Sequence, residues 1–295
     1  MRSRSPETTL LSGIVMAMLV VLLMHSAKSS RPPAASASYT LGHGPTVVLV
    51  HGLGSRIEHW LPTARILAPD YRVVLAELPG HGETALNEPL TLERAASSLE
   101  AAIAREGAGP VTLVGHSLGG LVAAQVALDH PEQVRSLVLV ETALMPAMND
   151  LERRAMQVQL EGNYDGLVRS AYMAFGRDSA QGAALAAEAA TVDPAVMKAW
   201  IHLALNTDLS QQVSALKVPT TAVFSDRTWP NDETWADNAK DLGLQRIPKL
   251  NPVRIAGCGH FVMLDRPDEL ARVIAHAAES ASEPVAVAAA SRSSR

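Results

Sequence analysis

Ser117 lies in the segment Gly115-His116-Ser117-Leu118-Gly119, between a short apolar run and an apolar stretch of helical character. A serine held at a tight turn from a strand into a helix has strained backbone angles, and side chains two residues away would collide with it. Glycines at 115 and 119 remove those side chains, so the pattern predicts a turn that lifts the Ser117 hydroxyl above the end of a sheet. The first amides of the following helix would then point at a developing oxyanion.

A serine hydroxyl is a poor nucleophile at neutral pH and needs a base within hydrogen-bond reach. His260 is the candidate base, because it follows the last predicted strand. Its neighbours Gly257 and Gly259 give the loop the freedom to aim the imidazole. We interpret three other histidines, which lie in turns where backbone geometry suffices, as structural: His51, His81 and His116.

Short apolar runs without polar alternation recur along the chain and predict strands that helices cover on both faces. The predicted strands are residues 46–50, 71–75, 111–114, 134–140, 219–225 and 252–256. Apolar residues at helical spacing separate them, so the sequence predicts an α/β fold with a mostly parallel, doubly wound sheet. Residues 142–217 have no strand signal and are predicted to form a helical cap inserted between two strands.

The composition is that of a folded chain without a nucleic-acid footprint. Of the 295 residues, 47% are hydrophobic and 19% are charged, which is enough apolar surface for a core. A formal net charge of −5 offers no cationic surface to a phosphate backbone, so we expect no nucleic-acid partner. Cys258 is the single cysteine and cannot form an intramolecular disulfide. The ten histidines lack HExxH or paired Cys/His spacing, and we predict neither a metal site nor a cofactor.

The two ends of the chain differ from the middle in composition. Arg2 and Arg4 precede an uncharged run over residues 10–24, which is the layout of a signal peptide or an N-terminal membrane anchor. Residues 1–38 are therefore predicted to be this leader followed by a linker. The protein is then expected either to be exported to the periplasm or secreted, or to be tethered to the membrane by the uncharged run. Residues 282–295 are predicted to be a disordered tail, which leaves residues 39–281 as one domain.

Motifs in chain order resemble the serine-nucleophile branch of the α/β-hydrolase superfamily. Besides the serine turn, they are His51-Gly52-Leu53-Gly54, similar to an HG-x-G turn, Leu78-Pro79-Gly80-His81-Gly82, similar to a P-G-x-G turn, and Gly257-Cys258-Gly259-His260-Phe261, similar to a G-H-F segment. The resemblance implies an α/β-hydrolase domain in which the amides of Leu53 and Leu118 form an oxyanion hole. It also implies catalysis without a cofactor, with the chain order Ser, acid, His.

The acid has two candidates. Ser225-Asp226-Arg227-Thr228 resembles the family's G-D-x-D segment, but Thr228 stands at the position of the usual aspartate and cannot carry the charge. Glu141 ends the strand after the nucleophile helix, 24 residues beyond Ser117, which resembles the placement in haloalkane dehalogenases and pancreatic-type lipases. We favour Glu141 and keep Asp226 as the alternative.

These residues predict a serine hydrolase of the carboxylesterase or lipase type that cleaves a small, apolar ester through an acyl-enzyme. Flexible thioethers tolerate varied apolar ligands, although they also fill ordinary cores. Five of the six methionines outside the N-terminal segment fall in the predicted cap: Met145, Met148, Met156, Met173 and Met197. One alternative is another reaction on the same fold, by an acyltransferase or by a lactone, amide or C–C hydrolase. The other is a non-catalytic binding module, which the non-acidic Thr228 suggests. The sequence indicates no obligate protein partner.

Overall fold

The computed structural model describes residues 35–281 except 87, 108 and 147. The predicted leader over residues 10–24 and the predicted tail over residues 282–295 lie outside the described residues. Within the part of the chain that is described, no helix combines the length and the apolar character needed to cross a bilayer.

One sheet organises the described residues. Seven strands form it in the order β1-β3-β2-β4-β5-β6-β7, and β1 alone runs antiparallel to its neighbour. The strands are β1 (Ser38–Leu41), β2 (Thr46–Val50), β3 (Arg72–Ala76), β4 (Val111–His116), β5 (Val134–Val140), β6 (Thr220–Ser225) and β7 (Leu250–Ile255). The predicted α/β class with a mostly parallel sheet is confirmed.

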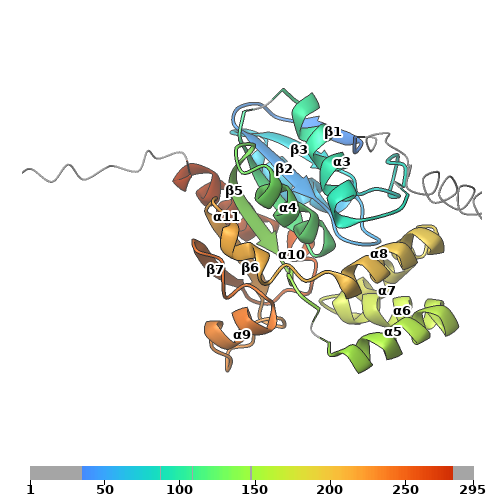
Figure 1. Ribbon diagram of the computed structural model, residues 1–295. Helices are drawn as coiled ribbons and strands as arrows, with labels where there is room; N and C mark the ends of the chain where they lie inside the picture. Colours follow the sequence, from blue (N-terminus) through green and yellow to red (C-terminus); the bar gives the residue numbers. More distant parts are fainter. Residues whose placement is uncertain (1–34, 87, 108, 147, 282–295) are drawn as a thin grey trace, which may run out of the picture. The chain divides into compact units, whose positions relative to one another are not determined.

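Helices cover both faces of this sheet (Figure 1). The packed pairs are α3 (Leu92–Arg105) with α4 (Leu118–Asp129) on one face, and α2 (Leu61–Leu67) with α11 (Pro267–Ser280) on the other. Leu113 and Val114 follow each other in β4 and belong to opposite cores, because successive side chains of a strand point to opposite faces. Short elements complete the domain: η1 (Ile57–Trp60), η2 (Gln212–Ala215), α9 (Trp235–Asp241) and α10 (Val262–Asp265).

A group of helices connects β5 to β6, as predicted, and we call residues 142–217 the cap. Its helices are α5 (Asp150–Gly162), α6 (Tyr164–Phe175), α7 (Ser179–Ala189) and α8 (Pro194–Asn206). Figure 1 shows them gathered beyond one end of the sheet. Trp200 on α8 is fully buried, and its indole N–H donates to the carbonyl of Pro79 at 2.9 Å, which anchors the cap to the core.

Two elements differ from the sequence prediction. β1 pairs at the edge of the sheet and starts at Ser38, where the prediction ended a linker. It alternates polar and apolar residues over only four positions, too few to stand out beside the longer apolar runs. α9 has seven residues, which is too short for a helical period to stand out.

Cys258, the single cysteine, is buried. Its thiol donates to the carbonyl of Ile255, and burial raises the pKa of this thiol to about 12.

The turn from β4 into α4 depends on close backbone packing. A Cβ at Gly119 would lie 2.2 Å from the carbonyl oxygen of His51, and one at Gly115 would lie 2.5 Å from the carbonyl oxygen of Gly119. Both obstacles are backbone atoms inside the core, so they cannot move aside cheaply. The two glycines are therefore required by the space around the turn.

We predict that Gly119→Ala destabilises the protein by about 1–3 kcal/mol, the usual size of an overpacking effect. Gly162→Ala, at the exposed end of α5 where a Cβ would meet nothing within 4 Å, should stabilise it by about 0.4–1 kcal/mol. Denaturant unfolding of both variants measures the difference. Equal stabilities would show that the packing at Gly119 is not limiting.

Candidate active site

Ser117 stands between β4 and α4 with φ 51° and ψ −120°, a strained conformation for a residue with a side chain. Its amide donates to the carbonyl of Val140 at 2.8 Å. Its carbonyl accepts hydrogen bonds from the amide of Gly120 at 2.9 Å and from the hydroxyl of Thr142 at 3.2 Å. Bonds to β5 and to the first residue of the cap therefore hold the serine in its strained conformation.

Glu141 also has a positive φ, 51°, directly after β5. Its side chain is 1% exposed, and burying a carboxylate is costly unless its oxygens are hydrogen-bonded. Here Oε1 accepts a hydrogen bond from the amide of Ser225. Oε2 accepts one from the hydroxyl of Thr228 at 2.7 Å and one from Nδ1 of His260 at 3.1 Å. Three donors thus compensate the buried charge.

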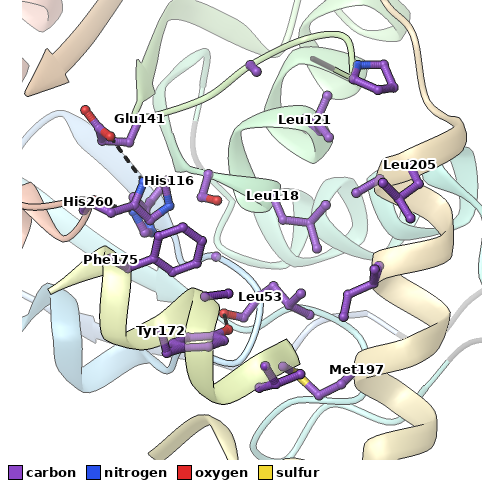
Figure 2. A pocket seen from close by; sticks show the side chains of 18 of the residues that line it. Leu53, His116, Leu118, Leu121, Glu141, Tyr172, Phe175, Met197, Leu205 and His260 are labelled. Carbon is purple, nitrogen blue, oxygen red and sulfur yellow. Dashed lines mark hydrogen bonds and ion pairs between the residues drawn. The ribbon is translucent and has the colours of Figure 1, made fainter. Parts of the chain in front are cut away.

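The His260 ring is held from several sides. Because Nδ1 donates to Glu141, the neutral ring carries its lone pair on Nε2, the atom needed for a base. The ring of Phe175 stacks on it with centroids 4.5 Å apart, and the carbonyl of Phe175 accepts from the amide of His260 at 2.9 Å. Nε2–H of His116 donates to the carbonyl of His260 at 2.9 Å. Figure 2 shows these four side chains grouped together.

Ser117 and His260 line the same cavity. Within the described residues the Ser117 hydroxyl has no hydrogen-bond partner, so it is not bonded to the imidazole in this structure. Such catalytic hydrogen bonds are often long before substrate binds and tighten in the complex. The arrangement brings the candidate nucleophile and the candidate base to one cavity.

Asp226 makes a different contact. The side chain of this half-buried residue accepts a hydrogen bond at Oδ1 from the amide of the exposed Gly257 at 3.2 Å. Thr228, at the position of the usual aspartate, donates to Glu141. The structure therefore brings Glu141 to His260 and leaves Asp226 apart from it. Among the residues described, no group of histidine, cysteine and acidic side chains is arranged to hold a metal ion.

Two histidines fix the turn that carries Leu53. Nδ1–H of His51 donates to the carbonyl of Gly52 at 2.8 Å, while Nε2 accepts from the amide of Leu78 at 3.2 Å. Nε2 of His81 accepts from the amide of Gly54 at 3.0 Å. Burial lowers the pKa of His51 to about 3 and that of His81 to about 4, so both rings are neutral and keep these bonds at neutral pH. Their contacts agree with the structural interpretation.

A cavity of about 480 Å³ lies between the core and the cap. The core contributes Ser117, His260, Leu53 and Leu118 to its lining. Among the described lining residues, Glu141 is the only aspartate, glutamate, lysine or arginine. Of the five cap methionines, Met173 does not line the cavity. The four that do are Met145, Met148, Met156 and Met197. The cavity is therefore suited to an uncharged, apolar ligand.

The cap also holds the loop that carries His260. Asp265, whose side chain is fully buried, accepts a hydrogen bond from the amide of Gly259 at 2.8 Å. Its other oxygen accepts from Arg177 at 3.0 Å and from Gln181 at 2.7 Å, both in the cap. Sequence reasoning missed these cap residues and Phe175, because no local motif surrounds them.

Residues 47–273 match the family model described as the alpha/beta hydrolase family. The chain belongs to this family. A protein of Escherichia coli O157:H7 that carries the name carbamate hydrolase RutD is 37% identical over 139 residues, 46% of this chain and 49% of that protein. The chain thus spans about half the length of the curated relatives it matches.

Solved structures agree with this chain in fold. An esterase from Thermogutta terrifontis superposes with a TM-score of 0.70 at 21% identity, over 83% of this chain and 93% of the esterase. An enol-lactonase from Burkholderia xenovorans does so with a TM-score of 0.68 at 20% identity, over 83% of this chain and 98% of the lactonase. At these identities the similarity establishes the fold alone.

We expect Glu141→Gln to lower kcat on a simple ester by up to about 10⁴-fold, because an amide neither stabilises the imidazolium nor enforces the Nδ1–H tautomer. Asp226→Asn should change it less than about threefold, since an asparagine at this half-buried position can still accept from Gly257. Steady-state kinetics of the two variants provides the measurement. The opposite ranking would assign the acid to Asp226.

Proposed function

We propose that this hydrolase cleaves uncharged carboxylic esters with an apolar acyl group through an acyl-enzyme on Ser117. The observation that carries the proposal is the contact of the buried Glu141 carboxylate with Nδ1 of His260 at 3.1 Å, beside the cavity that Ser117 also lines. A buried acid that fixes the tautomer of a histidine next to a strained serine is the arrangement that nucleophilic catalysis requires.

In the first half of the proposed reaction, Oγ of Ser117 forms a bond to the ester carbonyl carbon while its proton passes to Nε2 of His260. The carbonyl π electrons move to oxygen, and the amides of Leu53 and Leu118 donate to that oxyanion. Glu141 stabilises the imidazolium. Collapse of the intermediate breaks the bond to the leaving alkoxide, which takes the proton from His260.

In the second half, water attacks the acyl-enzyme along the same route. His260 removes a proton from the water, the oxyanion forms at the same amides, and Ser117 leaves with the proton returned by the imidazole. Chemistry of this kind uses only side chains and amides of the chain.

The cavity lining supports the apolar acyl group. Methionine, leucine, phenylalanine and alanine side chains cover most of it, and no lysine or arginine among the described lining residues could pair with an anionic acyl group. A volume of about 480 Å³ lies in the range of small-molecule sites. An ester with an uncharged, flexible acyl chain fits this lining, whereas a charged one would lose its hydration without compensation.

Labelling with a fluorophosphonate probe tests the nucleophile. The wild type should be labelled, since the probe's phosphorus is attacked by an activated serine with loss of fluoride, and Ser117→Ala should not be labelled. Mass spectrometry of the labelled peptide identifies the residue. An unlabelled wild type would favour the non-catalytic binding module instead.

A series of p-nitrophenyl esters tests the acyl group. From acetate to hexanoate, kcat/KM should rise about fourfold per added CH₂ that becomes buried, from ~0.8 kcal/mol for each. The p-nitrophenyl monoester of glutaric acid, with a chain of similar length that ends in a carboxylate, is the control and should react more slowly than the pentanoate. A flat series, or a preference for the anionic ester, would contradict an apolar acyl site.

A further inference from the structure

Two cap helices contact the loop that carries Leu53, and we call residues 51–55 the oxyanion loop. Tyr172 on α6 is 4% exposed, and its hydroxyl donates to the carbonyl of Leu53 (Figure 2). The approach is close, because a Cβ on Gly54 would lie 2.3 Å from the Tyr172 hydroxyl oxygen. The cap therefore rests directly on this loop.

A second connection runs through His59. The hydroxyl of Ser55 lies 2.7 Å from Nδ1 of His59, and Nε2 of His59 lies 2.6 Å from the carboxylate of Glu188 on α7. Burial lowers the pKa of His59, so the neutral ring donates from Nε2 to the carboxylate and accepts at Nδ1 from Ser55. Arg56 adds an ion pair to the same carboxylate at 2.9 Å. This chain of hydrogen bonds joins α7 to the end of the oxyanion loop.

These contacts set the directions of two peptide planes. The carbonyl of Gly52 and the amide of Leu53 belong to one plane, and the amide of Ser55 donates to that carbonyl at 3.3 Å. The carbonyl of Leu53, held by Tyr172, belongs to the next plane. Because a trans peptide unit is planar, the N–H of Leu53 points opposite to the carbonyl of Gly52. Nδ1–H of the core residue His51 also donates to the carbonyl of Gly52 at 2.8 Å, so core and cap contacts together fix the direction of this N–H.

We propose that Tyr172 and Glu188 are positioning residues that make the oxyanion hole depend on the seated cap. The inference rests on the proposed function, since the Leu53 amide has this role only if Ser117 forms a tetrahedral intermediate. With the cap seated, the amide points to the place where the oxyanion develops. With the cap displaced, the oxyanion loop loses these two contacts and keeps the bonds made by the core residues His51 and His81, so the oxyanion hole is held most firmly in the closed state.

The pair Tyr172→Phe and Tyr164→Phe tests the first connection. Both tyrosines lie on α6, but the buried hydroxyl oxygen of Tyr164 has no hydrogen-bond partner in the described part of the chain. Tyr172→Phe should lower kcat for p-nitrophenyl hexanoate about tenfold, which is about 1.4 kcal/mol, with KM unchanged within about twofold. Tyr164→Phe, which removes the same atom, should leave both constants unchanged.

A pair of ketones separates positioning from general loosening. A trifluoromethyl ketone with a hexyl chain takes the Ser117 oxygen onto its carbonyl carbon, its oxygen becomes the oxyanion, and the serine proton passes to His260. The methyl ketone of the same chain binds without this addition. Tyr172→Phe should weaken the trifluoromethyl ketone about tenfold and leave the methyl ketone unchanged. Equal weakening of both ketones, or of neither, overturns the proposal.

The variant Glu188→Ala tests the second connection. It also serves in place of Tyr172→Phe if that variant fails to fold. Its control is Glu161→Ala, another cap carboxylate, which is bonded to Lys198 and His202 away from the oxyanion loop. Glu188→Ala should weaken the trifluoromethyl ketone selectively by about threefold to tenfold, and the control should not. Failure of the wild type to bind that ketone better than the methyl ketone would overturn the proposed function itself. Normal discrimination by the wild type and by both positioning variants would overturn this inference alone.

Discussion

The buried contact between Glu141 and His260 is the interaction on which the rest of the site depends. A carboxylate removed from water is tolerated because three donors from β6, its following loop and the imidazole satisfy it. The same contact fixes which nitrogen of His260 is free. It also requires Glu141 at a positive φ, directly opposite the strained Ser117 at the end of the neighbouring strand. The strain at both strand ends is the local cost of aiming two side chains at one place.

The cap is part of this site as well as its cover. Phe175 stacks on the imidazole, while Arg177 and Gln181 reach the loop of His260 through Asp265. Tyr172 reaches the opposite wall at Leu53. The core therefore supplies the proposed reacting groups, whereas the cap supplies contacts on both sides of them.

Local patterns account for what the sequence could predict. Apolar runs predicted six strands, and the glycines around Ser117 predicted the turn, because a strand and a tight turn both depend on neighbours within a few residues. The family resemblance offered two candidate acids, since both Glu141 and Asp226 follow strands whose carboxyl ends meet at one edge of the sheet, and it favoured Glu141. The direction of each side chain decides the contact, and that direction depends on the positive φ of Glu141 and the hydroxyl of Thr228. Contacts from the cap join distant segments, such as Tyr172 and Leu53, which are 119 residues apart, and leave no local pattern.

The single cysteine has a practical consequence. Cys258 is buried, its thiol is hydrogen-bonded to a backbone carbonyl, and its pKa of about 12 leaves almost no thiolate at neutral pH. Maleimide reagents react with thiolates, so the natural chain offers them a nearly inert background. A cysteine engineered onto any exposed cap helix would therefore accept a fluorophore or spin label selectively, which makes distances between cap and core accessible to spectroscopy without first removing a native thiol.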